Sequence, residues 1–221
     1  GIDSRLHAFR IVFADCTPPE TPAAYEQTLH LYDGKLVTSV SLPGLRYTLT
    51  AFFNPAMPDM LALDIRWNGT SGMPALLLAP ELELPVSYGE VLSGTAERVQ
   101  SSADTALIKL SIGTAESMLG LRTLCTAGSI MLSDEARGIR LSCSGTHGHH
   151  LVLAGLSSWK RRDELSAALA SVTSPEQYAA SAAAAWHARF GNAGVFVPVP
   201  EYQKLWARSL YYTLASYRFK S

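Results

Sequence analysis

The residues best suited to chemistry are three histidines, His147, His149 and His150, which lie around Gly148. Imidazoles this close together could bind zinc, nickel or copper, although such a site needs a third or fourth ligand and a fixed tautomer. The neighbouring glycines favour a different interpretation, a hairpin turn in which the histidines are incidental. We therefore predict no metal and no other cofactor.

Paired carboxylic acids are the second chemical possibility, because two of them can perform acid–base catalysis at a glycosidic bond. Glu81 and Glu83 would share one face of a strand, and Asp134 and Glu135 are adjacent in a turn-like stretch. Acidic residues on outer faces and in turns are usually solvated, and we interpret both pairs in this way. The sequence also lacks nucleophile-elbow, phosphate-loop and His-Glu-x-x-His patterns. We therefore predict no catalytic residue in this chain.

The composition is that of a globular protein with few charges. Of 221 residues, 48% are hydrophobic and 17% are charged, and the formal net charge is -1. No block of like charges suggests a nucleic-acid partner, and no apolar run is long enough to suggest a membrane partner. The cysteines, Cys16, Cys125 and Cys143, fit no zinc pattern, so small buried side chains are favoured and one disulfide stays open. Because the chain begins with Gly1, we expect a segment cut from a longer precursor.

Positions 1–158 have the patterning of antiparallel strands. Asp33-Gly34 joins two alternating apolar runs, which is the strongest short-range signal of a hairpin. Between Met60 and Trp67 the apolar side chains alternate, so one face of that strand should be buried. The expected strands cover residues 25–31, 36–42, 46–53, 60–67, 105–112, 119–126, 129–132, 139–144 and 150–156, with a weak pattern between 69 and 104. Short strands separated by turn residues predict a mainly β protein, an antiparallel β-sandwich.

Positions 159–199 change to helical patterning and are predicted to form a helical linker. A first helix is expected at residues 163–172. Ser174 as N-cap, Pro175 in the first turn and Gln177 as capping-box partner then predict the start of a second helix. This helix should reach Phe190 and end at Gly191-Asn192.

Positions 200–221 are predicted to form a third unit, a single helix from Glu201 to about Phe219. Its more polar stripe consists of Glu201, Lys204, Arg208, Tyr211, Ala215 and Arg218. The rest of the helix is apolar or small, so it should have neighbours on several sides. Either a partner chain or further helices would supply them.

The order of these pieces resembles a junction found in inverting glycoside hydrolases and phosphorylases. The linker contains A-A-W-H-A-R-F at residues 184–190, and the last helix contains R-S-L-Y-Y at 208–212. The sandwich contains Y-E-Q-T-L-H-L-Y-D-G-K-L-V-T-S-V at 25–40, L-R-Y-T-L-T-A-F-F at 45–53 and L-A-L-D-I at 61–65. Together they are similar to families ninety-five and sixty-five, in which a β-supersandwich precedes an (α/α) six-hairpin toroid. The glycine-asparagine-glycine stretch that opens such sandwiches is not found before Tyr25.

The resemblance implies a galactose mutarotase-like supersandwich, linker helices and the first helix of an α/α toroid. The general acid and the group that activates water or phosphate would then lie beyond this chain, which should be inactive alone. The implied function is that of a non-catalytic N-terminal domain, which scaffolds the active site of a bacterial glycoside hydrolase acting on oligo- or polysaccharide. A periplasmic or secreted location is implied in the same way. The alternative is a stand-alone β-sandwich module that binds carbohydrate or protein.

The partners implied by the resemblance are a carbohydrate and a catalytic domain that packs on Trp206, Leu210 and Tyr217. A homo-oligomer that uses the same helix is a further expectation. The resemblance also offers a third interpretation of the histidine cluster, in which His147, His149 and His150 form a loop at the rim of the sugar pocket.

Overall fold

The computed structural model describes residues 9–14, 24–57, 60–70, 72–85, 91–135, 138–192, 195 and 198–216. The strands are β1 (Phe9–Phe13), β2 (Ala24–His30), β3 (Lys35–Leu42), β4 (Leu45–Phe53), β5 (Met60–Gly69), β6 (Leu76–Pro80), β7 (Glu83–Pro85), β8 (Val91–Ser101), β9 (Thr105–Ile112), β10 (Ala115–Glu135) and β11 (Gly138–Ser158). A short 3-10 helix, η2 (Trp159–Arg161), leads into α1 (Arg162–Ser171), α2 (Pro175–Asn192) and α3 (Pro200–Ser216).

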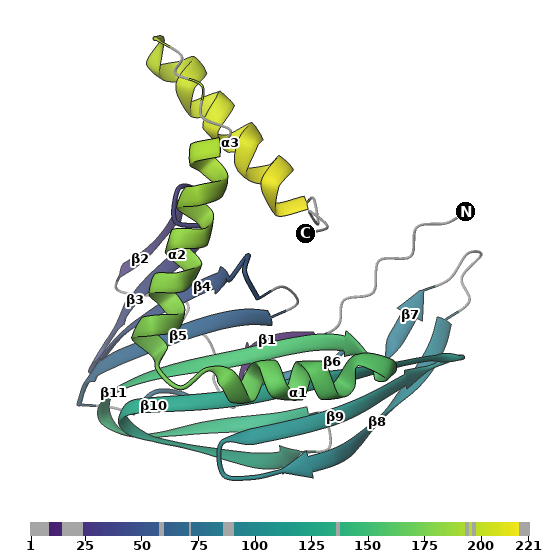
Figure 1. Ribbon diagram of the computed structural model, residues 1–221. Helices are drawn as coiled ribbons and strands as arrows, with labels where there is room; N and C mark the ends of the chain where they lie inside the picture. The colour runs from purple at the N-terminus through teal and green to yellow at the C-terminus, as the bar shows by residue number, and fades with distance from the viewer. Residues whose placement is uncertain are drawn as a thin grey trace.

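The strands form one continuous antiparallel sheet in the order β2-β3-β4-β5-β11-β10-β9-β8-β7. β11 is the central strand: its second half pairs with β5 and its beginning pairs with β6, which also pairs with β1. Register shifts in β10 around Ala127 and the positive φ of Gly145 in β11 bend the long β10–β11 hairpin. The sheet therefore curves over itself, as Figure 1 shows.

The main core lies inside this curved sheet. Alternate residues of β3, β4 and β5 face alternate residues of β9, β10 and β11, and β1 with β6 covers one side. Ile65, Leu78 and Leu119 are fully buried at its centre. The buried side chains come from strands on opposite sides of the curve, so the arrangement is a mainly β, antiparallel sandwich followed by helices, as the patterning predicts.

A second core lies on the outer face of the sheet, where α1 and the start of α2 cover β5, β9, β10 and β11. Leu165 and Leu169 of α1 pack there, and a Cβ at Gly120 would overlap Leu169, so the helix approaches the sheet closely. Arg122 Nη1 donates a hydrogen bond of 2.5 Å to the carbonyl of Leu169 near the C-terminal end of α1. The same carbonyl also accepts a backbone hydrogen bond of 3.3 Å from the Val172 amide, so the last turn of α1 is tied to both β10 and the C-cap.

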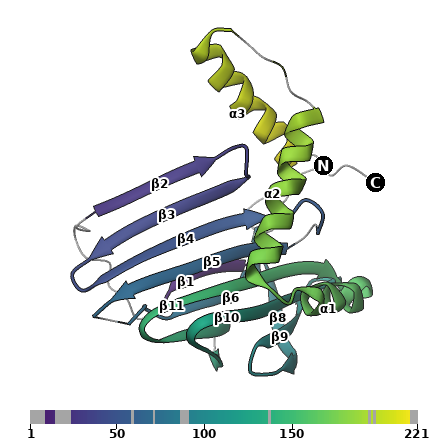
Figure 2. The same cartoon turned by 60° about the vertical axis from the view of Figure 1, so that its left-hand side comes forward.

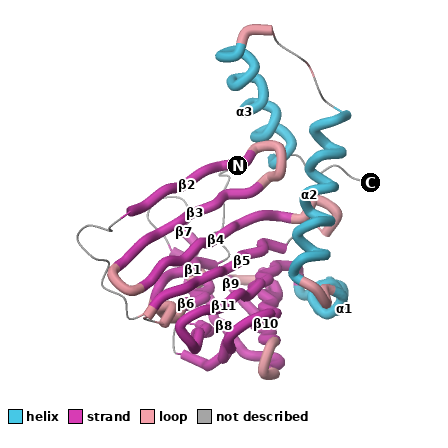
Figure 3. Tube along the Cα trace, turned by 90° about the vertical axis from the view of Figure 1, so that its left-hand side faces the viewer, coloured by secondary structure: helices cyan, strands magenta, loops and turns pink. Residues whose placement is uncertain are grey.

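α2 packs on the sheet along its first part, and α3 extends away from the sandwich beside α2 (Figures 2 and 3). Their contact is a small cluster in which Trp186 and Phe190 of α2 meet Leu210 and Tyr211 of α3. The Trp186 and Tyr211 rings are stacked, with centroids 5.5 Å apart. Among the described residues, none of the helices combines the length and apolar character needed to cross a bilayer.

Most expected elements are present, but one part of the strand pattern is wrong. Residues 119–126 with 129–132, and 139–144 with 150–156, belong to two long strands rather than four short ones. The predicted glycine-rich turn at His147–His150 is therefore not a turn, because these residues pair with β5 and β10. The start of α2 is confirmed: the Ser174 hydroxyl accepts a hydrogen bond of 3.3 Å from the Gln177 amide.

Candidate functional site

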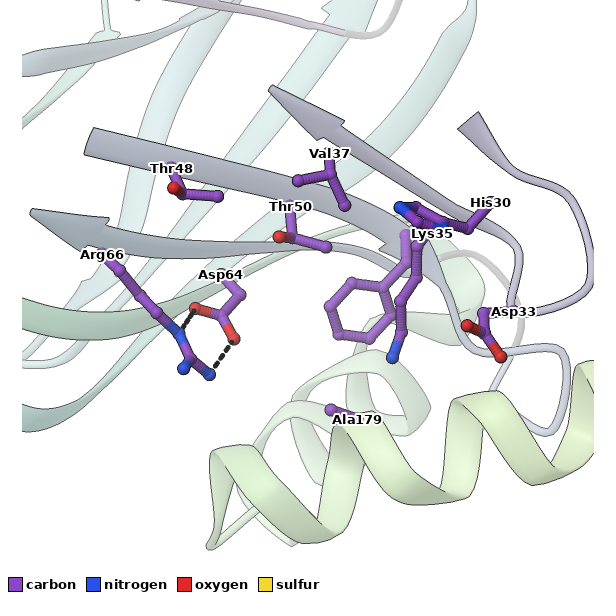
Figure 4. A pocket seen from close by; sticks show the side chains of 10 residues that line it. His30, Asp33, Lys35, Val37, Thr48, Thr50, Asp64, Arg66 and Ala179 are labelled. Atoms are coloured by element: carbon purple, nitrogen blue, oxygen red, sulfur yellow. Dashed lines mark hydrogen bonds and ion pairs between the residues drawn. The ribbon is translucent and has the colours of Figure 1, made fainter. Parts of the chain in front are cut away.

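The site is an open cavity of about 380 Å³ on the polar half of the outer sheet face, beside α2 (Figure 4). Strand register creates this surface, since Thr50 lies opposite Asp64, Thr48 opposite Arg66 and Lys35 opposite Phe52. The opposite faces of these strands carry the main core, so the side chains alternate between apolar and polar. The lining comprises His30, Asp33, Lys35, Val37, Thr48, Thr50, Phe52, Asp64, Arg66 and Ala179.

One end of the cavity is a charged cluster around Asp64. Arg66 donates two hydrogen bonds to its carboxylate, from Nε and from one Nη, each 3.2 Å long. His149 Nε2 lies 3.0 Å from Asp64 Oδ1. Donation of a hydrogen bond to Asp64 raises the pKa of Arg66. The contacts with Arg66 and His149 hold the Asp64 carboxylate in place. The pair with Asp64, shown in Figure 4, in turn orients the Arg66 guanidinium along the sheet face.

The other end of the cavity joins the β2–β3 turn to α2. His187 Nε2 of α2 lies 2.6 Å from Asp33 Oδ1, and Tyr32 stacks on the His187 ring at 4.1 Å between centroids. Lys35 extends over the buried Phe52 ring, with Nζ 5.9 Å from its centroid. Asp33 is therefore engaged by the helix, whereas the Lys35 ammonium points into the cavity in Figure 4.

α2 is fixed against the sheet by three further polar contacts. The Trp186 indole donates a hydrogen bond of 3.0 Å to the carbonyl of Phe53. Asn54 Nδ2 donates one of 2.7 Å to Ser181 Oγ, and Arg189 reaches the Pro55 carbonyl at 3.4 Å. Because Asn54 and Trp186 are both buried, these bonds hold the wall of the cavity that α2 provides.

The structure separates the three predicted histidines. Strand alternation places His147, which is exposed, and His149 on the outer face, and only His149 reaches the lining through Asp64. His150 is fully buried on the opposite face, where it stacks on Trp67 at 5.1 Å between centroids. Burial, and to a lesser degree the nearby His149, lowers the pKa of His150 to about 4. His150 is therefore a neutral core residue rather than a ligand.

Most of the cavity lining was not predicted from the sequence, although the polar faces of the strands that form it can be recognised there. Asp64 and Arg66 are the polar members of a strand whose other face is apolar, and Thr48 and Thr50 alternate with Tyr47 and Leu49 in the same way. Each strand has one polar face, but only the pairing order places β2, β3, β4 and β5 side by side.

The other candidate groups lie outside this cavity. Glu81 pairs with Arg10 at 3.1 Å, and Glu83 is exposed; the structure does not describe the side chains of residues 134 and 135. Within the described parts of the chain, no three potential ligands gather to hold a metal ion.

The cysteines differ from the expectation of small buried side chains. Cys125 is exposed and Cys143 is half-buried, and no disulfide joins these two described residues. Burial, with a contribution from Cys125, raises the pKa of Cys143 to about 11, so its thiol stays protonated at neutral pH. Cys16 lies outside the described residues.

α3 carries a second surface of interest. Its Leu210 and Tyr211 face α2, so Tyr211 does not belong to a solvent-facing stripe. On its other sides, Tyr202, Leu205 and Tyr212 are 63%, 60% and 58% exposed. Trp206 is half-buried, and Tyr217 lies outside the described residues. An apolar surface of this kind on a helix is typical of a place where another element packs.

Comparison with known proteins identifies the fold. No protein-family model matches the chain, and no curated protein matches its sequence. Among solved structures, the chain is similar to a protein described as a kojibiose phosphorylase from the human microbiome, with a TM-score of 0.60 and 9% identity. The match covers 85% of this chain and 28% of that protein. A heparinase III gene product matches over 69% of this chain and 22% of its own length, with 13% identity and a TM-score of 0.35.

The likeness to the phosphorylase-type structure confirms the coarser part of the expected fold, an antiparallel β-sandwich followed by helices. It extends over 85% of the chain, too much for the strands alone, so it includes helical residues. At this level of identity it describes architecture, and the chain spans little more than a quarter of the protein that it matches.

Proposed function

We propose that this chain is a non-catalytic β-sandwich domain of a carbohydrate-active enzyme, a glycoside hydrolase or phosphorylase. The observation that carries the proposal is the shared fold with a protein described as a kojibiose phosphorylase. The domain would scaffold a helical catalytic domain and contribute to the rim of its active site. We assign no catalytic residue to the chain itself.

The surface of α3 supports a scaffolding role. Leu205 and Tyr202 expose more than half of their side chains, and the Tyr211–Trp186 stack holds the helix against α2. In this proposal α3 is the first helix of an α/α toroid, and the catalytic domain covers Trp206, Tyr217 and the part of Leu210 that its contact with α2 leaves exposed. Burying such side chains stabilises an interface by roughly 1.5–3 kcal/mol each, so a few of them suffice to orient two domains.

The test begins with the reading frame that encodes this segment. The proposal expects several hundred further codons that specify helical hairpins; a stop codon directly after Ser221 would overturn it. The encoded polypeptide is then assayed on α-linked disaccharides, kojibiose included, in water and with phosphate. Cleavage in either medium supports the proposal and separates hydrolysis from phosphorolysis.

A matched pair of variants in that polypeptide tests the interface. Leu205→Asp should impair cleavage or domain association, because it places a carboxylate in an apolar contact, whereas Lys204→Gln should change neither. In the 221-residue chain, the uncovered α3 surface should instead cause self-association. A clean monomer by light scattering, together with an active Leu205→Asp polypeptide, would contradict the role of α3.

The second candidate function is a stand-alone carbohydrate- or protein-binding module. The observation that favours it is the cavity, whose described lining residues lie on β2–β5, on the turn between β2 and β3, and on α2. If the chain is such a module, the 221-residue chain should bind the ligand and the encoded polypeptide should cleave no disaccharide.

A further inference from the structure

We propose that the cavity beside α2 binds a negatively charged saccharide, with the sugar carboxylate of a uronic acid held by Lys35 and the rest of the sugar extending over the β4 threonines toward Arg66. This inference rests on the proposed role with carbohydrates and names the class of sugar that this surface would take. It concerns a binding site on the sandwich, apart from any catalytic centre.

The size and surface of the cavity suit a small sugar. Its volume of about 380 Å³ lies near the lower end of the range for small-molecule sites, roughly 300–1,000 Å³. Thr48 and Thr50 present hydroxyl groups that both donate and accept hydrogen bonds, as sugar hydroxyls require. Val37 and Phe52 add apolar surface for the carbon face of a sugar ring, so the lining offers both kinds of contact.

The charges of the lining distinguish an acidic sugar from a neutral one. Both lining carboxylates already have cationic or imidazole partners: Asp64 contacts Arg66 and His149, and Asp33 contacts His187. Their capacity to accept further hydrogen bonds from a ligand is reduced.

The cationic groups of the lining retain capacity to donate. Arg66 uses two of its five N–H groups on Asp64, which leaves three for other acceptors. Within the described ranges, no carboxylate pairs with Lys35, and His30 adds another nitrogen donor nearby. Glu176, outside the lining, also interacts electrostatically with Arg66, but it is fully exposed and accepts a hydrogen bond from Ser174, so solvent screens it. The donors that remain available in the cavity are therefore best matched by a ligand that carries a negatively charged hydrogen-bond acceptor.

The geometry of the donors favours a carboxylate attached to a sugar ring. Lys35 and Arg66 lie on β3 and β5, which are separated by β4, so they are two strands apart across the cavity. Adjacent strands lie about 4.8 Å apart, which separates the two residues by roughly 10 Å across the strands. Lys35 is level with Ala62 of β5, four residues before Arg66, so roughly 13 Å along the strands is added. The two threonines of β4 lie between them, as Figure 4 shows. A ligand held at Lys35 that extends toward Arg66 therefore passes the two hydroxyl groups, which a hexuronic acid can contact together with Lys35 and a lone small anion cannot.

The experiment titrates the 221-residue chain with glucuronate, galacturonate, glucose, galactose and inorganic sulfate. Amide chemical shifts report the location and calorimetry reports the affinity. We expect an acidic sugar to shift the amides of residues 35, 48, 50 and 66, and to bind at least about tenfold more tightly than its neutral counterpart. Lys35→Gln should weaken acidic-sugar binding about tenfold and leave neutral-sugar binding unchanged. Lys160→Gln, at an exposed lysine of η2, is the matched control and should change neither.

The inference would be overturned by equal binding of acidic and neutral sugars, by sulfate binding as tight as that of the acidic sugars, or by an acidic sugar that shifts other amides. Absence of binding by all five probes would overturn it too. The proposed function is decided separately, by cleavage activity of the encoded polypeptide. Active enzyme with an empty cavity refutes only the acidic-sugar site, whereas binding without cleavage refutes only the enzyme domain.

Discussion

Gly34 in the β2–β3 turn offers the sharpest test of how α2 docks on the sandwich. Its φ of +64° lies in the left-handed region, where a residue with a Cβ pays roughly 1–2 kcal/mol. A Cβ there would also overlap the indole ring of Trp186. Trp186 is 3% exposed and is held by its bond to the Phe53 carbonyl, so the ring cannot move aside freely.

Gly34→Ala should therefore combine two costs. Overlap in a well-packed contact adds roughly 1–3 kcal/mol to the backbone strain, which gives a total loss of about 2–5 kcal/mol in the free energy of unfolding. Gly113→Ala is the matched control, because Gly113 has a φ of +57° but its Cβ would have only an ordinary contact with Leu92, at 3.8 Å. It should lose only the backbone part, roughly 1–2 kcal/mol. Urea unfolding followed by circular dichroism measures both.

A second mutation identifies the source of the difference. In a Trp186→Leu background the smaller side chain leaves room for the new Cβ, so Gly34→Ala should cost no more than Gly113→Ala. If the two glycine variants lose the same stability in the natural background, within about 0.5 kcal/mol, the reasoning is refuted. Trp186 would then not occupy the space above the turn, and α2 would not be anchored there.

Three further predictions concern polar groups. The folded state holds the pKa of His150 near 4, whereas the ordinary value is 6.5. The free energy of unfolding should therefore be unaffected by His150 above pH 6.5 and should fall as the pH decreases toward 4. Urea unfolding should show a loss of about 3 kcal/mol over this range in the natural chain and no such loss in His150→Gln. Ser174→Ala should lower the free energy of unfolding by about 1 kcal/mol through loss of the N-cap, and an unchanged urea midpoint would contradict that bond. Asp64→Asn should cost about 1 kcal/mol and release Arg66 and His149, visible as changed side-chain nitrogen resonances; unchanged resonances would show that the cluster does not form in solution.

The sandwich could be predicted from the sequence wherever one strand face is buried and the other is not. The hairpin at Asp33-Gly34 and the strand at 105–112 are confirmed for this reason. β8 was missed because most of its residues are exposed on both faces, so its sequence does not alternate. Burial, not strand formation itself, produces the periodic signal.

The histidine cluster shows why a local pattern can mislead. Gly148 suggested a turn, yet it lies in the extended strand β11, where a Cβ would overlap the Trp67 ring. The glycine is there to admit a ring from β5, a neighbour some eighty positions earlier in the sequence. Such a requirement is invisible without the pairing order. The same limit explains why Asp64 and Lys35 could not be assigned to one cavity in advance.

The contact between Asp33 and His187 joins positions 154 residues apart. A ribosome adding roughly 5–20 residues per second needs about 10–30 s to cover that distance. During this interval the β2–β3 turn has emerged but the helix that holds it has not been made. β2, whose seven residues are all exposed even in the finished fold, is held meanwhile mainly by its pairing with β3. The β2–β3 hairpin thus gains its contact with α2 only after the helical segment has been synthesised.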